Sequence, residues 1–307
     1  MDLTINGANQ QYLADLQQTQ ASMQQAQAQL SSGNRLQRAS DDPSAISQIY
    51  ELQSHIALNQ QTQANLGAAQ SELNGADTAL QSAIQSVVSA ISVATQGATS
   101  TSTAQDRANL AIQAQGIQQA LVSLSQTQVN GHYIFSGDQS NQPSYHLDST
   151  QPDGVKQLFV ATDTRVIHDV NGTSIALART ASTIFDARDS SGNPTSGNVF
   201  AAINSLVTAL QNNDGAGIAA ASDSLKSANT YINGQLAFYG EAENRVSDAT
   251  QLAQKFLLQN QSDLGQIQNA DVPTAALELT RAQTQQQASL AVEAKVQQQP
   301  NLFSLLG

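Results

Sequence analysis

The side chains that most often carry chemistry are few in this chain and lie far apart. The four histidines, His55, His132, His146 and His168, lack the spacing of metal ligands, and no HExxH motif accompanies them. Cysteine is absent, which excludes a thiolate nucleophile, a disulfide framework and a cysteine-based metal site. No GxSxG, P-loop or GxGxxG motif occurs. The sequence therefore predicts a protein that is not an enzyme and needs no metal or cofactor.

Charge excludes two further classes of partner. The net charge is -12, and the twelve Lys and Arg residues are scattered from Arg35 to Lys295 without a cluster. Nucleic acids and anionic membrane surfaces both require a basic patch, so neither is expected to bind. The first residues resemble no secretory signal, and no apolar run reaches the length of a membrane span. On these rules alone the protein is expected in the cytoplasm.

Composition predicts helices with thin cores. Only 12% of residues are charged and 4% are aromatic, tryptophan is absent, and alanine is abundant beside glutamine, serine, asparagine and threonine. Alanine favours helix but buries little apolar area, which contributes roughly 25 cal/mol per Å². Such a chain needs length or partner molecules to become stable. We therefore expect an elongated protein that its neighbours complete.

Heptad spacing predicts one long helix from about residue 43 to 96. Pro43 suits a first helical turn, and Asp42 or Ser40 can cap the free amides there. A helix of this length spans roughly 80 Å, unless Gly67 or Gly75 interrupts it. Eleven of the fifteen positions reached by alternate steps of four and three are apolar: Ala45, Ile49, Leu52, Ile56, Asn59, Gln63, Leu66, Gln70, Leu73, Asp77, Leu80, Ile84, Val87, Ile91 and Ala94.

Further helices are expected on both sides of the centre. One covers about 104–129 and should pack antiparallel to the first, and another begins after Asn198. A second long helix follows the Asn-Asp-Gly turn, with apolar positions at Leu225, Ile232, Leu236, Tyr239, Val246, Ala253, Leu257, Leu264 and Ile267. The two long helices can pack together only if the chain runs out and back. The two termini should therefore lie together at one end.

Residues 131–197 differ in composition, with many Gly, Pro, Asp and β-branched residues, and are expected to form a small inserted β domain. Apolar residues flank Asn171-Gly172, a pair suited to the positive φ angles of a type I′ hairpin turn. A third strand is expected from Val155 to Ala161. A sheet this small needs a helix or a neighbouring subunit to cover its apolar face.

The two terminal segments have sparse heptads. Near the start, apolar residues recur at heptad spacing, but Gln20 and Gln27 occupy the positions that alternate with them. Near the finish, Gln286 shares a helix face with the apolar residues. Since isolated helices are marginal in water, we expect both segments to be mobile in the monomer and to order on assembly. The expected interface residues are Leu13, Leu16, Met23, Leu30, Leu279, Ala282, Leu290, Leu302, Phe303, Leu305 and Leu306.

Two motifs in these outer regions resemble those of a known family. The first is LSSGNRL at 30–36 with ASDDPSA at 39–45, which includes Arg35, Asp41, Asp42 and Pro43. The second is NAD at 269–271 with LTRAQTQQQASL at 279–290. Together they resemble the flagellin-like axial proteins of bacterial flagella, and the resemblance covers roughly two thirds of the chain. It implies that the terminal helices and the bundle contact neighbouring subunits.

Within that family, NGHYIFSG at 130–137 looks like the segment that leaves the helical domain in the hook-filament junction members. Tyr133, Phe135 and Gly137 carry this likeness. It implies a structural subunit that joins the hook to the filament. The implied partners are other copies of the chain, the hook-side hook-associated protein, flagellin and a cytoplasmic export chaperone. A short flagellin is the alternative, and a cytoplasmic signalling or scaffold bundle is more remote.

The resemblance also changes the expected location and organisation. It implies export through the flagellar channel without a cleaved signal, so the protein is expected outside the cell, on the flagellum. The expected fold is mainly α with a small β insert (α+β), an elongated antiparallel helical bundle or coiled coil with both termini together. The expected domains are terminal helical segments at 1–40 and 272–307, a bundle at 41–130 and 198–271, and the insert at 131–197.

Overall fold

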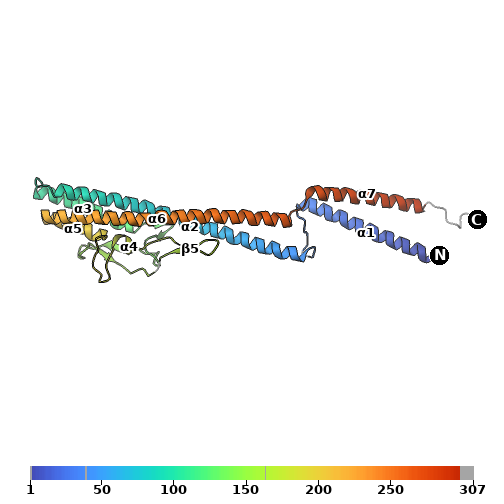
Figure 1. Cartoon of the computed structure of the whole chain (residues 1–307), viewed down its shortest axis with the longest axis horizontal. Coiled ribbons are helices and arrows are strands. Elements are labelled where there is room, and N and C mark those ends of the chain that lie inside the picture. Colours follow the sequence, from blue (N-terminus) through green and yellow to red (C-terminus); the bar gives the residue numbers. More distant parts are fainter. Residues whose placement is uncertain (1, 39, 163, 298–307) are drawn as a thin grey trace, which may run out of the picture. The chain divides into compact units, whose positions relative to one another are not determined.

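The computed structural model describes residues 2–38, 40–162 and 164–297, and these fall into two compact units (Figure 1). Unit 1 lies within residues 1–58 and 256–307. Unit 2 comprises Asn59–Lys255. The fold is mainly helical with a few short antiparallel strand pairs, as the sequence predicts.

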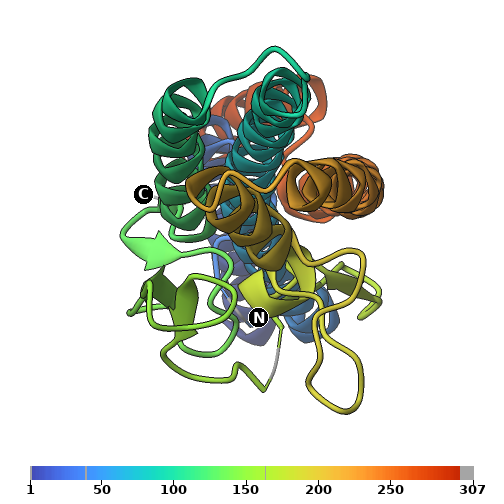
Figure 2. The ribbon, with the colours of Figure 1, turned by 90° about the vertical axis from the view of Figure 1, so that its left-hand side faces the viewer.

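Four helices build the frame of unit 2 (Figure 2): α2 (Pro43–Gly97), α3 (Ala104–Ser125), α5 (Val199–Gln211) and α6 (Gly215–Gln268), of which α2 and α6 continue into unit 1. The predicted helices are confirmed, although α3 ends at Ser125 and not near 129. Neither Gly67 nor Gly75 interrupts α2. A capping box starts α3, where Thr103 accepts from the Asp106 amide and Asp106 accepts from the Thr103 amide.

Alanine forms half of the core along α2. Leu66, Leu73, Leu80 and Val87 are fully buried, as the heptads predict. The alternate buried positions are Ala69, Ala76, Ala83 and Ala90, each one residue before the predicted Gln70, Asp77, Ile84 and Ile91. The latter four are only half-buried. The contact face is therefore turned slightly from the predicted one, because the small alanines allow helices to approach closely.

The insert contains three separate hairpins and one short helix. Strand β1 (Gln128–Val129) pairs with β2 (His132–Tyr133), β3 (Tyr145–Leu147) with β4 (Val155–Gln157), and β5 (Val166–His168) with β6 (Ser174–Ala176). Helix α4 (Ala181–Phe185) follows. The predicted strand at 155–161 is thus paired only as far as Gln157, and the first hairpin begins three residues before the predicted insert.

The prediction of a hairpin around Asn171-Gly172 is confirmed, but the predicted type I′ turn is wrong. Gly172 has a φ of 81°, whereas Asn171 is not among the described residues with positive φ. Asp169 holds this longer loop, since its Oδ1 accepts from the amides of Asn171 (2.9 Å) and Thr173 (2.7 Å). The tight turn lies instead at Asn130-Gly131, where φ is 53° and 81°.

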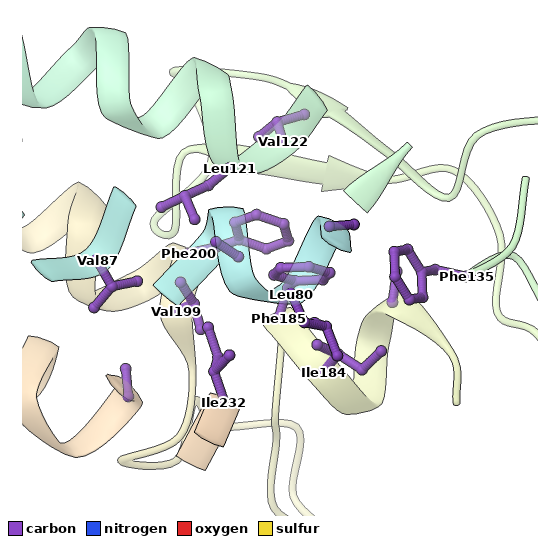
Figure 3. Packing of buried hydrophobic residues seen from close by; sticks show 14 of the residues in the cluster. Leu80, Val87, Leu121, Val122, Phe135, Ile184, Phe185, Val199, Phe200 and Ile232 are labelled. Atoms are coloured by element: carbon purple, nitrogen blue, oxygen red, sulfur yellow. The ribbon is translucent and has the colours of Figure 1, made fainter. Parts of the chain in front are cut away.

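Aromatic rings join the insert to the bundle (Figure 3). The Phe135 ring meets Phe185 and Tyr239 edge-on, with centroids 5.9 and 6.3 Å apart, and Phe185 stacks on Phe200 at 5.8 Å. These four rings come from the insert, α4, α5 and α6, and all are almost fully buried. Bundle helices therefore cover the apolar side of the insert, which meets the expectation that so small a sheet needs shelter.

In unit 1, helix α1 (Asp2–Ser32) lies against α7 (Val272–Gln297), and the two run antiparallel (Figure 1). Helix α1 begins at the end of unit 1 where α7 finishes. This agrees with the predicted out-and-back path of the chain.

Candidate assembly surfaces and the helix joint

The terminal helices pack through small side chains. Thr19 and Ala26 of α1 are buried, as are Ala275 and Ala282 of α7. Each pair is seven residues apart, so both helices present a coiled-coil stripe to one another. In α1, the nearby Glu293 carboxylate raises the pKa of the Tyr12 hydroxyl, and burial adds to this.

The predicted interface residues separate into three groups. Leu16, Met23, Leu30 and Leu279 are half-buried and Ala282 is buried, so these belong to the stripe between α1 and α7. Leu13 and Leu290 are 55% and 52% exposed. Leu302, Phe303, Leu305 and Leu306 lie outside the described residues. The buried positions that alternate with these apolar residues in α1 are Thr19 and Ala26, each one residue before the predicted Gln20 and Gln27. A role of these residues in contacts between subunits stays a prediction.

Two backbone segments cross where α1 and α7 meet the other helices of unit 1, and we call residues 33–37 and 267–270 the helix joint. Gly33, with φ at 71°, ends α1 in the left-handed region that glycine tolerates. The Arg35 amide donates to the Gln268 carbonyl (2.7 Å), and the Ala270 amide donates to the Gly33 carbonyl (2.8 Å). Asn34 and Asn269 thereby form an antiparallel bridge.

Two side chains hold the helix joint. Arg35 donates from Nε to the carbonyl of Ile267 (3.1 Å), which satisfies a carbonyl at the end of α6. Gln37 donates from Nε2 to the Ser32 hydroxyl (2.6 Å) and the Asn34 carbonyl (3.0 Å). The joint therefore links segments 232 residues apart through backbone and side-chain hydrogen bonds together.

The acidic pair before α2 serves local caps. Asp41 Oδ2 accepts from the amides of Gln37 (3.1 Å) and Arg38 (2.9 Å), which closes the loop after the joint. Asp42 Oδ1 accepts from the Ser44 hydroxyl (2.7 Å) and the Ala45 amide (3.1 Å), and these bonds lower the pKa of Asp42. Pro43 is the first residue of α2. The motif thus acts as the helix start expected from the sequence.

The junction-type segment lies inside unit 2. Phe135 is fully buried, and its carbonyl accepts from the Ala181 amide at 2.7 Å. Gly137 has a φ of 57°, and Tyr133 is a half-buried residue of β2. Of the three, Phe135 connects the insert to the bundle, since its ring packs edge-on against Tyr239 of α6. Their use as a marker of junction members stays a prediction.

A buried polar network was not predicted from the sequence. Tyr145 donates to Asp186 (3.0 Å), Arg188 pairs with both Asp186 and Asp153, and Asn198 Nδ2 donates to Asp186 (2.6 Å). Asp186 and Asp153 are nearly inaccessible. Burial lowers the pKa of Arg188, but its bonds to the two carboxylates outweigh this and raise it. No spacing in the sequence brings these residues together.

Residues 2–38, 40–162 and 164–297 contain neither a candidate metal site nor a candidate membrane span. Within these ranges, no group of three or more histidine or acidic side chains could hold a metal ion. No helix there has the length and apolar character needed to cross a membrane. The features that remain are the terminal helices, the joint and the insert.

Comparisons with known proteins agree on one family. The model of the bacterial flagellin N-terminal helical region matches residues 4–140, and that of the C-terminal helical region matches 222–306. The chain is 30% identical over 217 residues to flagellar hook-associated protein 3 of Escherichia coli (strain K12). That alignment covers 66% of this chain and 64% of the relative, which is less than two thirds of the relative's length.

Solved structures share the fold. A structure described as a flagellar hook-associated protein from Vibrio parahaemolyticus has a TM-score of 0.65 at 21% identity, covering 75% of this chain and all of that one. The flagellar junction protein FlgL from Legionella pneumophila has a TM-score of 0.56 at 15% identity, covering 72% and 99%. The two matched family models, which together cover residues 4–140 and 222–306, show that the chain belongs to the flagellin-like family, within which it is similar to flagellar hook-associated protein 3.

Proposed function

We propose that this chain is a structural subunit of the bacterial flagellum that joins the hook to the flagellin filament. The observation that carries the proposal is the 30% identity to a flagellar hook-associated protein 3. The geometry supports a structural role, since the exposed side chains of the terminal helices include Leu13, Leu277, Leu290 and Val292. Exposed apolar residues on a paired helix suit contacts with further helices.

The proposal includes partners and location. The partners are other copies of the chain, the hook-side hook-associated protein, flagellin and an export chaperone in the cytoplasm. The chain leaves the cell through the flagellar export channel without a cleaved signal and works outside the cell. No catalytic step belongs to this role.

We also propose that residues 1–40 and 272–307 order fully only on assembly. The buried residues of the stripe between α1 and α7, Thr19, Ala26, Ala275 and Ala282, are all small and contribute little apolar area. Its larger side chains, Leu16, Met23, Leu30 and Leu279, are only half-buried. Helices with so small a contact are marginal by themselves, whereas neighbouring subunits can supply the missing contacts.

A short flagellin that forms the filament itself is the second candidate. It is favoured by the two flagellin helical models, which match both outer regions of the chain. The two functions differ in what a cell without the chain still makes.

Deletion of the gene in its motile host separates these functions. Electron microscopy would show hooks and filaments, and an immunoblot would show flagellin in the medium. Hooks without filaments, with unpolymerised flagellin in the medium, are expected for a junction subunit. Hooks without filaments and without any other flagellin in the medium would identify the chain as the flagellin. Normal filaments in a strain with no second copy of the gene would overturn both functions.

A further inference from the structure

The stripe between α1 and α7 defines its own alignment poorly. Its buried positions, Thr19, Ala26, Ala275 and Ala282, are all small. The larger, half-buried side chains of α1, Leu16, Met23 and Leu30, also recur every seven residues, so they provide no knob that fits only one hole. A slip of one helix by seven residues would again place small residues against small residues. Another feature must therefore select the alignment.

The helix joint can select it, because both helices leave from the same backbone bridge. Ala26 lies eight residues before Asn34, and Ala275 lies six residues after Asn269. At 1.5 Å per residue, the two alanines stand about 12 and 9 Å from the bridge, which is nearly the same height. Thr19 and Ala282 stand together in the same way and line one pocket.

We propose that Arg35 and Gln37 are positioning residues that set the register of α1 against α7 through the helix joint. Arg35 ties the joint to the end of α6 at Ile267, and Gln37 ties it to the end of α1 at Ser32. The hydrogen bonds of both side chains end on residues outside the stripe, so each acts on the register through the bridge between Asn34 and Asn269. The register places Leu13 and Leu290 along unit 1, and their use in assembly rests on the proposed function.

Engineered cysteines test the register directly, because the natural chain has none. The purified full-length chain carries either an in-register pair, A26C with A275C, or a pair displaced by one heptad, T19C with A275C. A slip of seven residues moves a Cα atom by about 10 Å, beyond the reach of a disulfide. The rate of disulfide formation under mild oxidation is measured for each pair. A second in-register pair, T19C with A282C, serves as a repeat.

The pairs are compared in four backgrounds: natural, R35A/Q37A, R35K/Q37A and R38A. In the natural chain and in R38A, a matched control in the same loop, the in-register pairs should form disulfides at least about tenfold faster than the displaced pair. In R35A/Q37A that ratio should fall about tenfold, and R35K/Q37A should recover part of it, since lysine can still donate to the Ile267 carbonyl.

Three results would overturn the inference. The first is an unchanged ratio of in-register to displaced disulfide formation rates in R35A/Q37A, and the second is an equal fall of that ratio in R38A. The third is failure of both in-register pairs to form a disulfide in the natural chain. Circular dichroism melting of each variant identifies any loss of the unit 2 fold. A further variant, A270P, tests the bridge by an independent route, because proline lacks the amide that Ala270 donates to the Gly33 carbonyl. Because this assay uses purified protein, it can succeed even if the deletion experiment refutes the flagellar role.

Discussion

The Tyr145 hydroxyl donates a hydrogen bond to Asp186 Oδ2 at 3.0 Å, and both side chains are buried. The same carboxylate receives Arg188 Nε at 3.0 Å and Asn198 Nδ2 at 2.6 Å. Asn198 also caps α5, since its Oδ1 accepts from the Ala201 amide at 2.8 Å. Asp186 therefore links a strand of the insert to the start of a bundle helix.

Loss of the Asp186 carboxylate should destabilise unit 2 strongly. The substitution D186A leaves the Tyr145 hydroxyl and Arg188 Nε without an acceptor, and leaves Asn198 Nδ2 only its longer bond to the Ala187 carbonyl (3.4 Å). We expect a loss of about 3 kcal/mol or more. Y145F removes one donor to a charged acceptor and should cost about 1–2 kcal/mol. Urea denaturation followed by circular dichroism measures both.

Two matched substitutions serve as controls for this pair. Tyr50 is largely exposed, and Asp223 belongs to an exposed pair with Lys226. Y50F and D223A should each change the free energy of unfolding by less than about 0.5–1 kcal/mol. If D186A were no more destabilising than D223A, the network would contribute nothing to unit 2.

Alkaline pH should weaken the fold through the same tyrosine. Burial and then the nearby Asp186 charge raise the pKa of Tyr145 well above its ordinary value of 10.0. Above about pH 10 the unfolded chain loses this proton while the folded chain keeps it, so stability falls by up to about 1.4 kcal/mol per pH unit. Below pH 10 both states hold the proton, and this group gives no dependence.

Urea midpoints between about pH 8 and 11 measure this slope. Y145F should show a shallower loss than the natural chain, and Y239F should behave likewise, because burial also raises the pKa of Tyr239. Y50F should keep the natural slope. Identical slopes in Y145F and the natural chain would contradict the assignment.

Two glycines of α2 should respond in opposite ways to alanine. A Cβ at Gly67 meets nothing within 4 Å, so G67A should raise stability by about 0.5–1 kcal/mol through helix propensity. A Cβ at Gly75 would lie 2.5 Å from Cγ2 of Val129, in the first hairpin. G75A should therefore be less stable than G67A by about 1–2 kcal/mol.

A double-mutant cycle locates the cause of that difference. G75A should be tolerated better in a V129A background than in the natural chain, because the methyl groups that collide are gone. Thermal melting of the four proteins measures the coupling. Equal effects of G75A in both backgrounds would show that Val129 is not the obstacle.

The sequence predicts most helix positions because their signals are local. Pro43 and Asp42 mark the start of α2, and Asn198 marks that of α5. The contact faces were predicted less well. Counting large apolar residues selects Ile84, whereas the structure buries Ala83, and alanine is too common in this chain to stand out.

Distant partners could not be predicted at all. Arg35 bonds to Ile267, 232 residues away, and Arg188 bonds to Asp153 across two loops. Such pairs depend on how elements pack, not on spacing along the chain. The turn at Asn130-Gly131 carries the same local Asn-Gly signal as the pair at 171–172, and here both residues have positive φ.

The exposed leucines of the terminal helices should matter for assembly and not for the monomer. L13S and L290S remove exposed apolar side chains, so each should change the stability of the purified chain by less than about 0.5 kcal/mol. In the deletion strain, both variants should reduce filament formation and motility. Leu158 in the insert is similarly exposed, and L158S should leave motility unchanged. Normal motility with L13S and L290S together would refute the interface.

Removal of both terminal segments should leave the bundle folded but unable to assemble. Every residue of the main hydrophobic cluster lies between Leu66 and Ala253, so a chain of residues 41–271 retains that core. Circular dichroism should show one cooperative melting transition, and hydrogen exchange should remain slow in α3 and α5. The truncated chain should fail to restore filaments in the deletion strain. Non-cooperative melting would mean that the bundle depends on the terminal helices, and restored filaments would mean that assembly does not.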